Sequence, residues 1–118
     1  MLTEHEEQGN LINWCDSHHD YRVRSIYAHM NGVRTTIGAA MKAKAEGARA
    51  GIPDLFLPIG SNGFFGLYLE MKRTRGGTLS DVQKKRMFAL SQSGYECVRA
   101  NGAEEAKLAI EEYLNIYE

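Results

Sequence analysis

The stretch from residue 54 to residue 73, DLFLPIGSNGFFGLYLEMKR, holds two apolar runs on either side of Asn62-Gly63. Asn-Gly between apolar runs is a strong signal for a tight β-hairpin. The sequence therefore predicts antiparallel neighbouring strands over residues 54–59 and 64–73. The other elements must be arranged around this hairpin.

Polar residues interrupt the apolar pattern of the hairpin. Because side chains alternate along a strand, Glu70 and Lys72 share the face opposite to Leu69. A turn centred on Asn62 places Asp54 directly across from Glu70, and a one-residue shift of the turn makes that contact diagonal. Facing carboxylates repel unless a cation lies between them, and Mg²⁺ prefers oxygen ligands. We therefore expect a metal site at Asp54 and Glu70, with Lys72 beside it.

Glu70 and Lys72 also have a purely structural explanation, because a lone Glu-x-Lys usually marks the outer face of a half-exposed strand. The dipeptide Pro53-Asp54 favours a site instead, since proline presets the backbone before the carboxylate. Gly47 and Gly51 precede it and permit close approach of a ligand or a neighbouring strand. We therefore favour the metal site over an ordinary strand surface.

The net charge of −1 conceals an uneven distribution. Residues 1–21 contain five acids and no Lys or Arg, residues 22–99 contain thirteen Lys and Arg against five acids, and residues 100–118 contain one Lys against five acids. A basic block can bind a polyanion by releasing counterions, or can be a solvated surface. We take nucleic acid as the partner, with candidate contacts at Arg34, Lys44, Arg49, Arg73, Arg75 and Lys84.

The remaining patterns predict one α/β domain over residues 1–118, with a mixed central sheet flanked by helices. The expected helices are one from N-cap Thr3 to Ser17, one over 35–46, one from N-cap Ser80 to Ser93, and one after residue 100. The expected strands outside the hairpin cover 25–29 and 95–99. The apolar face of the last helix is expected to comprise Ala106, Ala109, Ile110, Tyr113 and Tyr117.

Two more polar residues fall on apolar helix faces. Glu7 lines up with Leu11 and Trp14, which makes it a candidate metal ligand, although a first-turn acid is also favoured by the helix dipole. Gln83 lines up with Met87, and a buried amide there can position a water or a ligand, or can make a merely structural hydrogen bond.

Other chemistries lack a motif. Cys15 and Cys97 have no second ligand at metal spacing and are expected to be small core residues. The segment His18-His19-Asp20 lacks the spacing of zinc ligands and is interpreted as a helix end. No nucleotide-binding loop, nucleophile elbow, leader or membrane-length apolar run is found, so we expect a cytoplasmic protein without a nucleotide cofactor.

In their order and spacing, these motifs resemble the VRR-NUC domain, the virus-type replication-repair branch of the PD-(D/E)XK nuclease superfamily. The segments that carry the resemblance are residues 46–55, residues 66–73, Leu79 to Gln83, Gly94-Tyr95, Asn31-Gly32 with Arg34, and Glu7-Gln8. The resemblance implies an αβββαβ core and dependence on Mg²⁺ or Mn²⁺. It also implies a metal held by Asp54, Glu70 and the carbonyl of Met71, with Glu7 as the helix ligand.

The resemblance further implies a function. Standalone members of this size, common in phages and bacteria, resemble Holliday-junction resolvases and are expected to be homodimers. We therefore expect a structure-specific DNA endonuclease of replication, recombination or repair that favours branched DNA, with Asp54, Glu70, Lys72 and Gln83 as its catalytic residues. Two alternatives stay open: a catalytically idle DNA-binding accessory protein, and a nuclease that acts on RNA.

Overall fold

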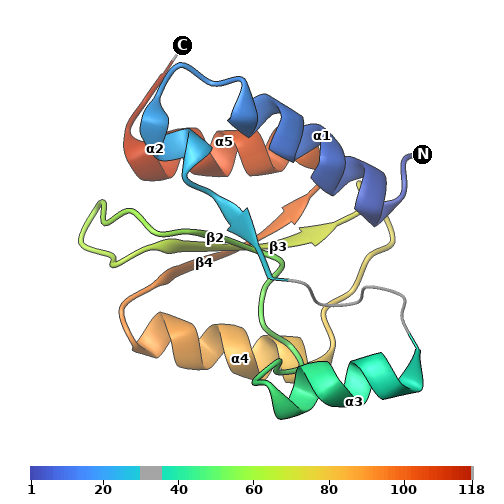
Figure 1. Cartoon of the computed structure of the whole chain (residues 1–118). Helices are drawn as coiled ribbons and strands as arrows, with labels where there is room; N and C mark the ends of the chain where they lie inside the picture. Colours follow the sequence, from blue (N-terminus) through green and yellow to red (C-terminus); the bar gives the residue numbers. More distant parts are fainter. Residues whose placement is uncertain (30–35, 118) are drawn as a thin grey trace.

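The computed structural model describes residues 1–29 and 36–117 (Figure 1). The elements follow the predicted αβββαβ order, with two short helices inserted and one helix appended. In chain order they are α1 (Glu4–Asp16), α2 (Tyr21–Arg24), β1 (Tyr27–Ala28), α3 (Ile37–Ala45), β2 (Leu55–Leu57), β3 (Leu67–Lys72), α4 (Asp81–Gln92), β4 (Glu96–Asn101) and α5 (Ala103–Leu114).

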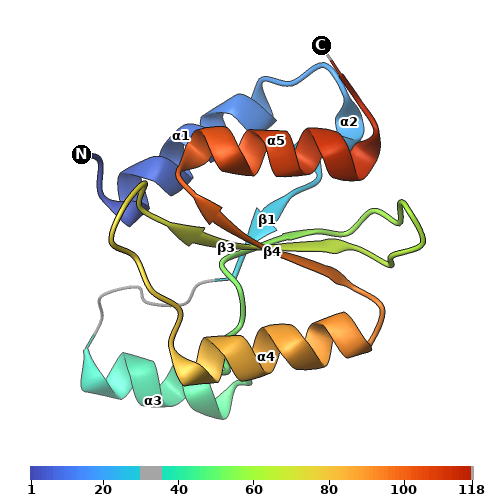
Figure 2. The same cartoon turned by 180° about the vertical axis from the view of Figure 1, so that it is seen from behind.

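The strands form one mixed sheet in the order β1-β2-β3-β4. Both β1–β2 and β2–β3 are antiparallel, whereas β4 runs parallel to β3 after the crossover through α4. Helices α1, α2 and α5 cover one face, and α3 and α4 lie on the side of the other (Figures 1 and 2). This is the sandwich around a mixed sheet that the sequence predicts.

A two-residue turn closes the hairpin. Ser61 and Phe64 exchange backbone hydrogen bonds of 3.1 and 2.9 Å, and the residues between them, Asn62 and Gly63, have φ values of 52° and 84°. Positive φ at both central positions suits the twist of a hairpin and explains why Asn-Gly occurs there. Tyr113 of α5 anchors the turn, because its carbonyl accepts hydrogen bonds from the side chains of Ser61 and Asn62.

The strand register does not follow directly from this turn. Continued regularly, the turn would pair Leu55 with Glu70, but Leu55 pairs with Leu69. The difference arises because segment 58–60 contains one residue more than segment 65–66 between the turn and the ladder. An unpaired extra residue of this kind shifts the alternation of one strand against its partner.

This shift puts Asp54 in line with Glu70, on the strand face that also carries Lys72. The predicted register of the hairpin is therefore confirmed. The turn itself is centred between Asn62 and Gly63 rather than on Asn62, and the extra residue compensates for that difference.

The hydrophobic core lies between the sheet and the pair α1 and α5. Leu69 and Met71 of β3 are fully buried there against Leu11, Cys15 and Ile110. Cys15 is the core residue that the sequence predicts, whereas Cys97 is half-buried. This packed face holds the sheet rigidly behind the polar residues of the opposite face.

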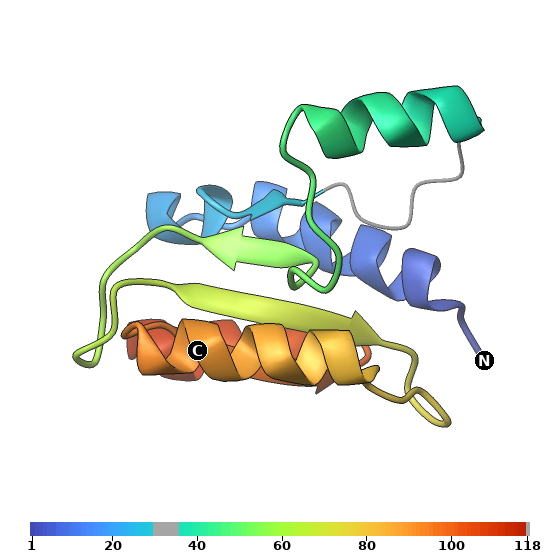
Figure 3. The same cartoon turned by 90° about the horizontal axis from the view of Figure 1, so that it is seen from below.

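Helices α3 and α4 cover their face of the sheet less completely than α1, α2 and α5 cover the other face. None of the nine described residues of α3 and none of the twelve of α4 is buried. Seen from below, α3 stands apart from α4, and β2 lies between them without a helix over it (Figure 3). The described helices include none that is long and apolar enough to cross a membrane.

Four expectations need correction. Asp20 is the N-cap of α2 rather than part of a helix end, because its side chain accepts a hydrogen bond from the Arg22 backbone. The expected strand over 25–29 is reduced to Tyr27–Ala28. The two hairpin strands are also shorter than predicted. Tyr117 lies beyond the end of α5 and is exposed. The expected contact Arg34 falls outside the described residues.

Candidate metal centre

Asp54 stands at the entrance to β2, directly after the buried Pro53. Its Oδ2 accepts a 2.8 Å hydrogen bond from the backbone N–H of Met71. This bond fixes one carboxylate oxygen against β3. The carboxylate is therefore held at the position that the strand register assigns to it.

Glu70 is the buried member of the group, with 1% of its surface exposed. Its Oε2 lies 3.9 Å from the Nζ of Lys72, and among the described residues it has no hydrogen-bond partner. Burial, followed by the hydrogen bond and the negative charge of Asp54, raises the pKa of Glu70 from 4.5 to about 9, against the opposing charge of Lys72. Such a carboxylate holds a proton until a cation replaces it.

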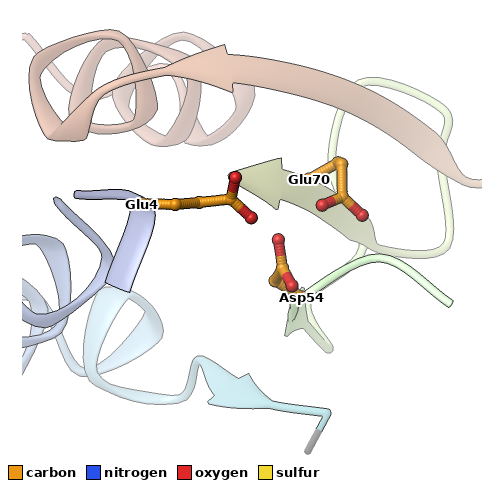
Figure 4. A group of neighbouring side chains, drawn as sticks. All are labelled: Glu4, Asp54 and Glu70. Carbon is orange, nitrogen blue, oxygen red and sulfur yellow. The ribbon is translucent and has the colours of Figure 1, made fainter. Parts of the chain in front are cut away.

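A third carboxylate comes from the first turn of α1. Carboxylate oxygens of Glu4, Asp54 and Glu70 all lie within 4.8 Å of one another (Figure 4). Glu4 extends from the end of its helix over the edge of the sheet, and the other two side chains point toward it. Among the described residues, this is the one group of three or more His, Cys, Asp and Glu side chains close enough to share an ion.

The structure does not bring Glu7 into this group, and the helix position is taken by Glu4 instead. Glu7 Oε2 accepts a 2.9 Å hydrogen bond from the Thr74 hydroxyl, and Oε1 accepts one of 3.1 Å from the Ala103 N–H. Its buried position was predicted, but both of its oxygens are used to join α1 to the loop after β3 and to the start of α5. The signal for Glu4 was its place in the first turn, where a side chain can reach past the helix end.

Lys72 and Gln83 lie side by side. The buried Lys72 donates a 3.4 Å hydrogen bond from Nζ to Gln83 Oε1, which also accepts one of 2.9 Å from the Ser80 N–H. Gln83 is therefore both part of the capping box that begins α4 and the neighbour of the lysine. The structure thus brings together Asp54, Glu70, Lys72 and Gln83, as the sequence predicts.

Of the basic residues expected to contact nucleic acid, Arg73 lies beside this centre. A cavity of about 390 Å³ opens next to it, lined by Glu4, Lys72, Arg73 and Gly77 among others. The guanidinium of Arg73 is tied to the carbonyl of Gly76. The exposed members of the expected set are Lys44, Arg49, Arg73, Arg75 and Lys84.

Comparison with known proteins places this geometry in a family. The model of the VRR-NUC domain matches residues 2–104. The chain belongs to the VRR-NUC family. A solved structure described as a VRR_NUC domain protein superposes with a TM-score of 0.85 at 27% sequence identity, covering 100% of this chain and 93% of that one. Among proteins with curated functional descriptions, none matches.

VRR-NUC membership makes this chain a nuclease domain of the PD-(D/E)XK type. Its carboxylates fit a divalent cation on their own chemistry. Three hard oxygen donors converge, and one of them carries a buried oxygen without a hydrogen-bond partner among the described residues. Hard oxygen donors of this kind are the ligands that a cation such as Mg²⁺ prefers.

Proposed function

We propose that this VRR-NUC chain is a Mg²⁺- or Mn²⁺-dependent endonuclease that hydrolyses phosphodiester bonds in branched DNA. The observation that supports it best is the pairing of buried Glu70 with Lys72, beside two more carboxylates at one edge of the sheet. Carboxylates alone would repel a phosphate. With a cation and a lysine among them, the same residues can bind a phosphate and promote the attack of water on it.

Glu4, Asp54 and Glu70 are the side chains that would hold the cation, and the carbonyl of Met71 is the further ligand that the family resemblance implies. When bound, the cation supplies positive charge for the phosphate oxygens and lowers the pKa of the attacking water. The backbone N–H of Met71 keeps one oxygen of Asp54 in place, which leaves the other oxygen available to the ion.

Lys72 is the side chain to which we assign a direct role in the hydrolysis. Its ammonium can orient the attacking water and stabilise the extra negative charge on phosphorus in the transition state. Gln83 holds this ammonium at 3.4 Å, and the N–H of Ser80 fixes Gln83 in turn. The leaving oxygen is the 3′ one, so the product carries a 5′-phosphate.

A homodimer would present two such centres to two strands, as symmetric cleavage of a four-way junction requires. Sedimentation of the protein alone and on a four-way junction tests this step. We expect two protomers on each junction. A single protomer on the junction, with cleavage intact, would contradict the dimeric arrangement.

The substrate is tested by incubating the protein with Mn²⁺ and single-stranded, duplex, flap, four-way and RNA substrates of matched sequence. We expect the branched DNA to be cut fastest. Faster cleavage of RNA would assign the chain to RNA instead. Binding without cleavage of any substrate would make it an accessory protein.

A further inference from the structure

A row of aromatic rings crosses the sheet beside the carboxylates. Tyr27 of β1 contacts Phe56 of β2 edge to face at 5.8 Å, and Phe56 stacks on Tyr68 of β3 at 4.3 Å. Tyr95 continues the row at 5.4 Å from Tyr68, and Phe65 follows at 6.0 Å from Tyr95. Five rings thus form one continuous row of contacts, which we call the aromatic row.

This aromatic row and the metal centre lie on the same face. Tyr27 pairs with Phe56, and Phe56 pairs with Tyr68, so their side chains point to one side of the sheet. Asp54 lies two residues before Phe56, and Glu70 lies two residues after Tyr68, which is the same direction because β2 and β3 are antiparallel. Two residues of strand span about 7 Å, so the rings begin one short step from the carboxylates.

The row is open to solvent at its ends. Tyr27 is 55% exposed and Phe65 is 69% exposed. No helix lies over β2 on this side in the described part of the chain (Figure 3). Exposed aromatic rings in a row beside a catalytic group indicate a binding surface rather than a core.

The distribution of charge over the helices indicates which kind of partner binds to the aromatic row. Helix α1 carries four acids and no Lys or Arg, and α5 carries four acids and one Lys. On the side of the aromatic row, α3 carries two lysines and no acid, and α4 carries three Lys and Arg against one acid. A second copy that docked here by the same face would bring like charges together, whereas a nucleic acid complements them.

We propose that Tyr27, with Phe56 behind it, stacks on an unpaired base of the substrate next to the cleaved phosphate. The inference rests on the proposed function and narrows it to nucleic acids that offer an unstacked base near the cut, such as a branch point or a flap. Every base has a π face, so stacking on aromatic rings tolerates any sequence while requiring that the base leave its helix.

The test uses DNA with 2-aminopurine, a base whose fluorescence falls on stacking, at the unpaired position of a flap. All proteins carry Asp54→Asn to prevent turnover. Protein with Tyr27 should quench the probe, Tyr27→Leu should lose the quenching and bind about tenfold more weakly, and Tyr27→Trp should restore both. Tyr21→Leu is the matched control, because Tyr21 is an exposed tyrosine on α2, across the sheet from the row.

Equal quenching and affinity in Tyr27→Leu would overturn the stacking site. So would a dimer that becomes a monomer in Tyr27→Leu, since the row would then be an interface between copies. Cleavage of the same flap by protein with native Asp54 is measured separately. Cleavage without quenching contradicts the stacking alone, and quenching without cleavage contradicts the proposed function alone.

Discussion

Glu4 and Glu7 begin the same helix three positions apart and meet different surroundings. The exposed carboxylate of Glu4 joins Asp54 and Glu70, whereas Glu7 is 7% exposed and bonded to Thr74 and Ala103. The N-cap of α5 is Gly102, which has no side chain to cap it. Glu7 supplies that cap from another helix.

Substitutions of these two residues should distinguish an effect on cation affinity from an effect on the stability of the fold. Glu4→Gln should lower Mn²⁺ affinity by about tenfold or more, since it removes one charged ligand. Its melting temperature in EDTA should stay close to that of the native chain. Glu7→Ala should lower the free energy of unfolding by about 1 kcal/mol, the usual size of a lost cap. Calorimetric Mn²⁺ titration and thermal unfolding measure the two effects. A loss of Mn²⁺ affinity in Glu7→Ala but not in Glu4→Gln would return the ligand role to Glu7.

The sequence predicts Asp54, Glu70 and Lys72 because strand alternation and one turn are local properties. It does not predict Glu4. The helical pattern identifies which acid faces inward, and that acid is Glu7. Which acid reaches the edge of the sheet depends on how far α1 slides along β3, and this is set by packing between distant segments.

The buried carboxyl of Glu70 makes the metal-free protein sensitive to pH. Burial and Asp54 raise its pKa from 4.5 to about 9, so the folded chain binds more protons than the unfolded chain between these values. The contribution of Glu70 to the free energy of unfolding is fully present below pH 4.5 and falls as the pH rises from there toward 9.

Melting curves in EDTA from pH 5 to pH 9 measure this dependence. The native chain should lose stability toward pH 9, and Glu70→Gln should flatten that loss because its amide does not titrate. A parallel decline in both proteins would assign the dependence to other groups.

At the scale of elements, the hairpin shows what local signals determine. Asn62-Gly63 predicts the turn, but the extra residue in segment 58–60 has no local signature that fixes its position. The sequence does not predict helix α2, because four residues are too short to show a helical period. The predicted alignment of Asp54 with Glu70 is right because this extra residue offsets the displaced centre of the turn.

Gly66, which directly precedes β3, and Gly9, within α1, should respond oppositely to alanine. In Gly66→Ala the new Cβ would lie 2.7 Å from the Phe56 ring and 3.0 Å from the Leu57 carbonyl, which should destabilise by about 1–3 kcal/mol. In Gly9→Ala the new Cβ would have nothing within 4 Å, and the free energy of unfolding should rise by about 0.5–1 kcal/mol. Denaturant unfolding checks both, and equal effects would contradict the packing of Phe56 over Gly66.

At the scale of the molecule, charge blocks along the chain become layers. The acidic first and last blocks supply α1 and α5, which pack together on one side of the sheet. The basic middle supplies α3, α4 and the loop after β3, and also the short helix α2, which carries two arginines and lies on the side of α1 and α5. The sequence shows the blocks, and only the fold shows that the two acidic ones are neighbours.

Lysines from the two layers should therefore differ in DNA binding. Lys44→Gln and Lys84→Gln should each weaken binding and reduce the salt slope by about one unit, as expected for a lost phosphate contact. Lys107→Gln should change neither, because Lys107 lies on α5 and pairs with Glu104 at 2.8 Å. Fluorescence anisotropy over a salt series measures this, and equal slopes for all three variants would contradict an oriented approach.

The most direct test of the hydrolytic centre is cleavage of a four-way junction in Mn²⁺ by the native chain, Asp54→Asn and Lys72→Met. We expect cleavage by the native chain that stops in EDTA. The rate of cleavage should fall by at least about a hundredfold in both variants while DNA binding persists, as for removal of a transition-state contact. Undiminished cleavage by either variant, or cleavage by the native chain in EDTA, would contradict the assignment of Asp54, Glu70 and Lys72 as the hydrolytic centre.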